Sequence, residues 1–321
     1  MKAVLDEKKN TFLNIFPNEL KERFRECSEI VSELSEIRLR VGGLASVYRL
    51  GRECFLAGDG SLTDDEALAG KFEKNEIEAI LNHVCDHSAY AFEKELGNGY
   101  ITTRGGHRIG VCGEYVTDNN GVCHMKHIGF MNIRIAHEMI GVANPLIPYL
   151  FENDRFLSTM IISPPGCGKT TILRDLIRQL SNGAMDRAGI KVGLVDERSE
   201  IAGVYRGIPQ NQIGMRTDVL DGCEKADGIF LLLKSMSPEI IAVDEVTSER
   251  DVQALIRASG CGCRFLLTMH GENYEITRNR QIMKKIMDEE IIERIVCLQF
   301  CGNRRVMEIR QPDGRLVHKW A

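Results

Sequence analysis

The sequence has no long hydrophobic run and no excess of basic charge. No apolar stretch approaches the roughly 20 residues that a membrane-spanning helix needs, so we expect no direct transmembrane insertion. Lys and Arg total 41 against 46 Asp and Glu, a net charge of -5. This balance argues against a protein whose whole surface is built to bind nucleic acid, although a local basic patch stays compatible with it.

The eleven cysteines lack the spacing of a zinc site. Cys261-Gly262-Cys263 is too tight for zinc and has no second pair at a matching distance. Charged residues interrupt Met1–Lys9 before any apolar run can form, so we expect no secretory signal. The sequence therefore predicts a cytoplasmic protein in a reducing compartment, with most thiols acting as small buried side chains.

The composition predicts an ordinary globular protein with two domains. Its 321 residues include 43% apolar and 27% charged side chains, which excludes a disordered chain and allows more than one core. Residues 1–143 mix helical and strand patterns, as a smaller α+β domain does. A candidate linker begins at Asn144-Pro145. In residues 144–321 short apolar strands alternate with helices, which predicts a parallel α/β sheet.

Hydrophobic periodicity predicts the elements of the first domain. We expect helices over residues 13–31 and 75–95. The expected strands cover residues 37–41, 46–50, 99–103, 107–111 and 132–135, with a glycine turn at Arg104-Gly105-Gly106 between the third and the fourth.

A short strand at residues 160–162, a glycine-rich turn and an amphipathic helix predict a phosphate-binding loop. Gly166 and Gly168 allow backbone N–H groups to surround phosphate oxygens at the helix N-terminus. Lys169 supplies a charge for the β- and γ-phosphates, and the Thr170 hydroxyl is a predicted Mg²⁺ ligand. Ser163 replaces the first glycine of the usual pattern, which is acceptable if its φ is negative. The predicted nucleotide-binding residues are Ser163, Pro164, Pro165, Gly166, Cys167, Gly168, Lys169, Thr170 and Thr171.

A second buried strand, residues 239–243, ends in Asp244-Glu245. Carboxylates at the carboxyl edge of a parallel sheet lie where ligands bind. Asp244 is predicted to hold Mg²⁺ through water, and Glu245 to orient and deprotonate the attacking water. The alternative is a solvated acidic pair at a strand end.

Two more strands end in polar residues. The strand at residues 264–268 leads to His270, which would face the γ-phosphate if this strand lies beside the 160–162 strand. The alternative is a histidine that bonds only to nearby backbone. The strand at residues 191–195 leads to Asp196-Glu197-Arg198-Ser199-Glu200. Glu197 and Glu200 compete with Glu245 as the general base, or are solvated loop carboxylates.

Taken together, these motifs resemble the stage III sporulation protein AA family over nearly the whole chain. The resemblance rests on residues 164–171, 195–200, 216–221 and 268–271, with further matches at residues 36–40, 105–110 and 132–136. That family is similar to the ATPases of type II and type IV secretion systems. These are hexameric rings with an N-terminal α+β domain on a RecA-like ATPase domain.

The resemblance implies ATP and Mg²⁺ as ligands and ATP hydrolysis as the activity. It implies a ring-type motor or assembly ATPase for a channel between mother cell and forespore. The protein would be a homo-hexamer at the mother-cell side of the membrane, held there by membrane proteins of the channel complex.

Rings of this kind bring arginines from a neighbour or from the N-terminal domain to the γ-phosphate, where they stabilise transition-state charge. The candidates are Arg134 and Arg216, followed by Arg104 and Arg108. The alternative for each is a surface salt bridge.

Two other functions remain open from the sequence. One is a nucleotide-dependent scaffold with little intrinsic turnover. The other is a nucleic-acid-handling ATPase that uses Arg104, His107, Arg108 and Arg134 as a basic strand face. Nucleic acid is the less favoured partner, because the net charge is negative and no aromatic-basic motif is present.

Overall fold

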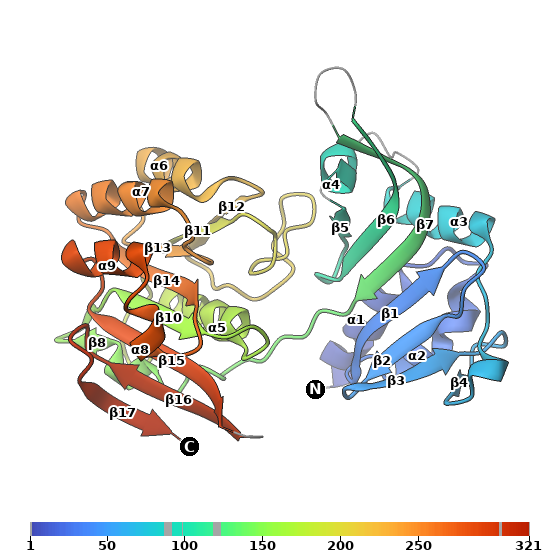
Figure 1. The fold of residues 1–321 in the computed structure, drawn as a ribbon, viewed down its shortest axis with the longest axis horizontal. Coiled ribbons are helices and arrows are strands. Elements are labelled where there is room, and N and C mark those ends of the chain that lie inside the picture. The colour runs from blue at the N-terminus through green and yellow to red at the C-terminus, as the bar shows by residue number, and fades with distance from the viewer. Residues whose placement is uncertain (1, 87–91, 98, 118–122, 302–303, 321) are drawn as a thin grey trace. The chain divides into compact units, whose positions relative to one another are not determined.

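The computed structural model describes residues 2–86, 92–97, 99–117, 123–301 and 304–320 (Figure 1). They divide into two units, residues 1–137 with 205–210 and residues 138–204 with 211–321. The sequence placed a boundary at residues 143 and 144, whereas the units change at residues 137 and 138. Nothing in the sequence indicated that residues 205–210 belong to the first unit.

The first unit is built on an antiparallel sheet with the strand order β4-β3-β2-β1-β7-β6-β5. Its elements are α1 (Lys2–Leu13), η1 (Lys21–Phe24), α2 (Arg25–Glu29), β1 (Leu34–Arg40), β2 (Ser46–Arg49), β3 (Arg52–Leu56), β4 (Leu62–Thr63), η2 (Glu66–Leu68), α3 (Lys74–Val84), α4 (Glu93–Gly97), β5 (Tyr100–Thr102), β6 (Arg108–Thr117) and β7 (Cys123–Arg134). The observed strands overlap every strand predicted for this part of the chain.

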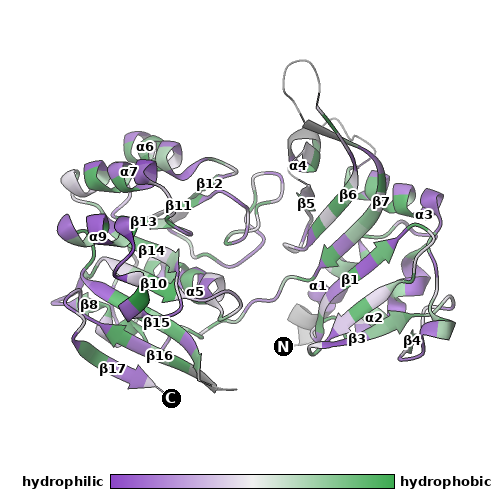
Figure 2. Ribbon diagram, in the orientation of Figure 1, coloured by the Kyte–Doolittle hydropathy of each residue, from purple (hydrophilic) through white to green (hydrophobic). Residues whose placement is uncertain are grey.

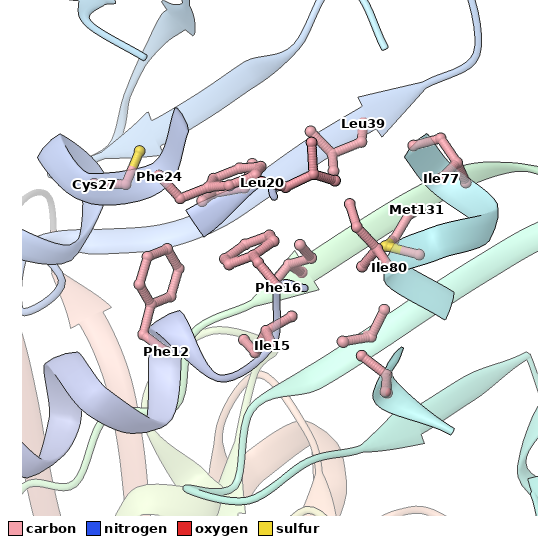
Figure 3. Close-up of a cluster of buried hydrophobic side chains, with 14 of the residues drawn as sticks. Phe12, Ile15, Phe16, Leu20, Phe24, Cys27, Leu39, Ile77, Ile80 and Met131 are labelled. Carbon is pink, nitrogen blue, oxygen red and sulfur yellow. The ribbon is translucent and has the colours of Figure 1, made fainter. Parts of the chain in front are cut away.

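A core of aromatic and aliphatic side chains lies against one face of this sheet (Figure 3). Phe12 and Phe16 come from the N-terminal segment, and Ile77 and Ile80 from α3. Strand β1 contributes Leu39, since alternate residues of a strand point to the same face. The helices therefore cover the inner face, and the charged residues of β1 lie on the other.

Both helices predicted for this unit are longer than the helices observed there. Residues 13–31 contain only the end of α1 and the short elements η1 and α2. The rings of Phe16 and Phe24 stack with centroids 3.6 Å apart, whereas eight residues of continuous helix would separate them by about 12 Å. The helix expected over residues 75–95 ends at Val84, and Asp86 follows with a φ of 48°. Residues 87–91 of that prediction lie outside the described residues.

The second unit has the strand order β12-β11-β13-β14-β10-β15-β16-β17 in its main sheet. Its elements are η4 (Ile147–Tyr149), β8 (Phe151–Glu152), β9 (Arg155–Phe156), β10 (Thr159–Ser163), α5 (Lys169–Asn182), β11 (Val192–Asp196), β12 (Thr217–Asp221), α6 (Lys225–Ser235), β13 (Ile240–Val243), α7 (Glu249–Gly260), β14 (Arg264–His270), α8 (Tyr274–Thr277), α9 (Gln281–Asp288), β15 (Arg294–Cys301), β16 (Arg304–Arg310) and β17 (Leu316–Trp320).

The six neighbouring strands β12-β11-β13-β14-β10-β15 are all parallel, which is the predicted RecA-like α/β arrangement. The sheet is not wholly parallel, because β16 and β17 continue it in antiparallel pairing. They follow β15 directly in the chain, and a short connection between neighbouring strands can only join them antiparallel. The predicted parallel sheet is therefore correct for its central part and wrong for this edge.

Helices cover both faces of this sheet (Figure 1). Helix α5 buries its apolar side on one face, and α6, α7 and α9 pack on the other. Helix α7 mixes hydrophobic and hydrophilic residues, as Figure 2 shows. Strands β10, β11 and β13 are buried along their whole length. Because these strands are parallel, the polar residues that end them gather at one edge of the sheet.

Among the described residues, no helix is both long and apolar enough to cross a membrane.

Candidate nucleotide site

The loop at residues 163–168 joins strand β10 to helix α5. Gly166 has a φ of 77° and Gly168 a φ of 90°, values in the left-handed region that favour glycine. Gly168 is the N-cap of α5, so the first N–H groups of a 14-residue helix open toward the loop. A bound phosphate would accept hydrogen bonds from such groups.

The other residues of this loop differ in how far they are bonded or buried within the second unit. The Ser163 hydroxyl donates to the Pro164 carbonyl at 2.7 Å, and Ser163 is not among the residues with positive φ. The condition that the sequence set for serine at this position is therefore met. Cys167 is fully buried, while Pro165 and Gly166 are exposed. Thr170 and Thr171 begin α5 and are half-buried.

Lys169 lies beside the acidic pair that follows β13. Its Nζ is 3.2 Å from Asp244 Oδ1 and 4.0 Å from Glu245 Oε2, and the lysine side chain is 8% exposed. A buried ammonium is costly without a charged partner, so this pairing stabilises the lysine where it stands. Two motifs 75 residues apart in sequence thus meet at one sheet edge.

Thr268, the fifth residue of β14, connects the two acidic residues. Its hydroxyl donates to Asp244 Oδ1 at 2.7 Å and accepts the Glu245 backbone N–H at 2.8 Å. Thr268 is fully buried, so both bonds are made without competition from water. The sequence interpretation gave this residue no role. Its sequence signals were a hydroxyl at the end of an otherwise apolar strand and its place in the 268–271 motif.

Glu245 has a backbone conformation that is unusual for its type. Its φ of 47° lies in the left-handed region, which costs a non-glycine residue about 1 kcal/mol or more. The Thr268 bond and the adjacent bond from Val246 N–H to the Thr268 carbonyl, 2.9 Å, hold this turn. The strained turn directs the carboxylate back toward Lys169 and His270.

His270 ends β14, which lies beside β10 as the sequence interpretation required. Ser163 and His270 are paired in the parallel register. His270 Nε2 is 3.5 Å from Glu245 Oε2, and its Nδ1 is buried without a hydrogen-bond partner among the described residues. Local backbone therefore does not satisfy this ring.

The acidic segment after β11 is folded around Asp196. Backbone N–H groups of Glu200, Ile201 and Ala202 donate to its carboxylate at 2.8 to 3.0 Å. Burial raises the pKa of Asp196 to about 6, although these hydrogen bonds act in the opposite direction. Asp196 thus shapes the loop, a role that the sequence interpretation did not assign to it.

The contacts recorded for Glu197 and Glu200 lie away from Lys169. Glu197 forms an ion pair with Lys225 of α6. The Glu200 carbonyl accepts a bond of 2.6 Å from Arg174 of α5. Strand β11 is also separated from β10 by β13 and β14, so its carboxyl end lies farther along the edge.

Arg216 lies just before β12, at the edge of the sheet opposite the glycine-rich loop. Strand β12 runs parallel to β11, and its first residue pairs with Val192 at the start of β11. The Arg216 guanidinium donates to the Ser181 carbonyl at the end of α5, at 3.1 Å. The structure therefore does not bring Arg216 to Lys169 of the same chain.

The remaining candidate arginines lie on the first unit. Arg134 of β7 is directly opposite Arg108 of β6 and Glu36 of β1, and it has no ion pair or side-chain hydrogen bond with a described residue. The Arg108 guanidinium stacks 3.6 Å above the Tyr100 ring, and Arg104 is exposed in the turn.

His107 does not belong to a basic strand face, which corrects the nucleic-acid hypothesis at that residue. It is 1% exposed, and its Nδ1 accepts the Ala136 N–H at 3.2 Å. Burial lowers its pKa to about 4, so the ring is neutral near pH 7.

The arrangement fits a nucleotide with Mg²⁺. A glycine turn at a helix N-terminus and a buried lysine match a polyphosphate. The Thr170 hydroxyl and the Asp244 carboxylate are the hard oxygen donors that Mg²⁺ prefers.

Two solved structures share the fold of this chain. The chain resembles the ATPase DotB of Legionella pneumophila with a TM-score of 0.58 at 17% identity, covering 92% of this chain and 82% of that one. It resembles the pilus retraction motor PilT, solved with bound ADP, with a TM-score of 0.58 at 16% identity, covering 89% and 81%. The fold is therefore that of the secretion-type ATPases, a RecA-like unit preceded by an α+β unit.

Sequence similarity identifies the family within this class. The family described as "Sporulation stage III, protein AA" matches residues 6–316. The chain is 38% identical over 312 residues to "Stage III sporulation protein AA" of Bacillus subtilis (strain 168), covering 97% of both. The chain belongs to this sporulation protein family, as the motifs predicted.

Proposed function

We propose that this protein is a Mg²⁺-dependent ATPase that works in sporulation. The observation that carries this proposal is the meeting of Lys169 with Asp244 and Glu245, at 3.2 and 4.0 Å, beside the glycine turn. The pairing brings together the groups that phosphoryl transfer needs, a phosphate-binding cation and carboxylates for the metal and for water.

Each residue of the proposed site has a separate task. Lys169 releases Asp244 and binds the β- and γ-phosphates. Thr170 and Asp244 hold the metal, and Thr268 keeps the Asp244 carboxylate in place through its 2.7 Å bond. Bound Mg²⁺ would neutralise phosphate charge and favour the transition state.

Glu245 is the proposed general base. Its carboxylate is near both Lys169 and His270, whereas Glu197 is engaged by Lys225 and Glu200 lies after a more distant strand. His270 would orient Glu245 or the attacking water.

We also propose the assembly that the family resemblance implies. Six copies would form a ring on the mother-cell side of the membrane, bound to membrane proteins of a channel between mother cell and forespore. Arg134 would approach the γ-phosphate of a neighbouring subunit, which is supported by its lack of a partner among the described residues. The domain boundary near residue 143 would then mark the connection between the two parts of each subunit.

The test is phosphate release by the purified protein with Mg²⁺-ATP. Lys169→Ala should abolish both nucleotide binding and release, and Glu245→Gln should keep binding while lowering turnover by about 100-fold or more. Lys191→Ala, which removes an exposed lysine before β11, is the matched control and should behave as wild type. Equal release by wild type and Lys169→Ala would refute the ATPase proposal.

A further inference from the structure

A cavity of about 330 Å³ lies beyond Glu245, on the side of the sheet that carries α7 and α9. Its walls include Glu245 and Thr247 after β13, His270 at the end of β14, and Arg280 and Gln281 at the start of α9. At about 30 Å³ for each water, its volume corresponds to about ten water molecules. The cavity thus adjoins the proposed reaction centre and has room for a hydrated small anion.

Arg280 is the cation of this cavity. Its Nη1 donates to the His270 carbonyl at 2.5 Å, which fixes the guanidinium beside the histidine that contacts Glu245. This is the one side-chain bond recorded for Arg280 within the described part of the chain. Its other N–H donors are available, and their planar fork matches the oxygens of a phosphate.

The proposed reaction produces an inorganic phosphate at the wall of this cavity. Water oxygen bonds to the γ-phosphorus, and the bond from this phosphorus to the bridging oxygen breaks, its electron pair passing to ADP. One water proton passes to Glu245 and the other stays on the phosphate. The released phosphate therefore starts beside Glu245, in the wall of the cavity that also carries Arg280.

We propose that this cavity receives the inorganic phosphate after hydrolysis and that Arg280 binds it. The inference rests on the proposed function, because the phosphate arises from the same site. His270 also lines the cavity and is held next to Arg280 through its carbonyl, so the phosphate would leave Glu245 along a wall that carries this cation. Nucleotide binding and phosphate binding thus use different cations, Lys169 and Arg280.

The test measures inorganic phosphate binding to full-length protein saturated with Mg²⁺-ADP, by calorimetric titration. Arg280→Ala should weaken phosphate binding on the order of tenfold, the effect of losing a charged hydrogen bond. The phosphate affinity of Arg280→Lys should lie between those of wild type and Arg280→Ala, because lysine keeps the positive charge but not the planar pair of N–H donors. Lys284→Ala, which removes an exposed positive charge from the same helix, is the matched control.

This readout does not need turnover, so the two proposals can fail separately. Unchanged ADP affinity with weakened phosphate binding in Arg280→Ala supports the inference, even in a protein that hydrolyses ATP slowly. Phosphate binding that is absent in wild type, or equal in Arg280→Ala and Lys284→Ala, overturns it, whatever the ATPase rate. Loss of ADP binding in Arg280→Ala would also overturn it, because the residue would then serve the nucleotide site.

Discussion

At the scale of single residues, the Thr268 hydroxyl holds both acidic residues of this site in position. It is the common partner of Asp244 and the Glu245 backbone, and it stands on the strand next to β10. The proposed metal ligand and the proposed general base are useful only if their carboxylates stay within a fraction of an ångström of position. The threonine does this by using its single donor and one acceptor at once.

Replacing Thr268 with valine should separate this role from simple packing. Thr268→Val keeps the shape but leaves the Glu245 N–H without its acceptor, so the free energy of unfolding should fall by about 1–2 kcal/mol. Turnover should fall on the order of tenfold, because Asp244 loses its donor. Denaturant unfolding and phosphate release measure the two effects.

Thr217→Val is the control for this substitution. Its hydroxyl bonds to the Ile213 carbonyl at the start of β12, away from the glycine-rich loop. Turnover in Thr268→Val that matches Thr217→Val would show that the Thr268 bonds have no functional role.

At the scale of elements, the connection from β14 to α8 places His270. Gly271 follows it, and a Cβ at this position would lie 2.0 Å from Thr277 Oγ1 and 2.9 Å from Ile162 Cγ2. The Gly271 N–H also donates to the Ser163 carbonyl at 3.1 Å. The close approach of α8 to β10 therefore requires glycine, and it fixes where β14 ends.

Gly271→Ala should push α8 away from β10. Overpacking of this kind costs about 1–3 kcal/mol, and we expect a matching fall in thermal stability together with reduced turnover. Gly260→Ala is the control, since a Cβ there meets nothing within 4 Å at the end of α7. If Gly271→Ala melts at the same temperature as Gly260→Ala and wild type, α8 does not pack tightly against β10 at this glycine.

Elements with a simple local pattern were predicted well. Strand β10 and helix α5 carry a regular periodicity and a glycine turn, and the structure has them where the sequence indicated. The prediction of one helix over residues 13–31 was wrong, because a turn, and not helical spacing, brings the apolar residues Phe16 and Phe24 together. Periodicity does not distinguish these two ways of burying the same side chains.

At the scale of the whole molecule, the proposed ring makes each site depend on two subunits. Arg134→Ala and Glu245→Gln should each turn over poorly as single variants. If Arg134 acts on a neighbour's nucleotide, an equal mixture reassociated before assay should regain up to about a quarter of wild-type turnover, since random pairing restores that share of interfaces.

The control for this experiment is a mixture of Lys169→Ala with Glu245→Gln, whose defects lie in one subunit's site. The turnover of that mixture should not recover, because every subunit in it carries a defective nucleotide site, which no neighbouring arginine can restore. Failure of the first mixture to exceed its components would contradict an arginine supplied by a neighbour.

The sequence by itself determined the order of strand, glycine turn and helix, and it identified the family. These are local features, written in residues that are adjacent along the chain. It left Glu197 and Glu200 as rivals of Glu245 for the role of general base. Tertiary structure decided which of them lies near Lys169, because the strand order places β14 next to β10, then β13, and β11 farther away. Strand order arises from long-range pairing, which no short motif encodes, so only the folded sheet could bring Asp244, Glu245 and Thr268 to Lys169.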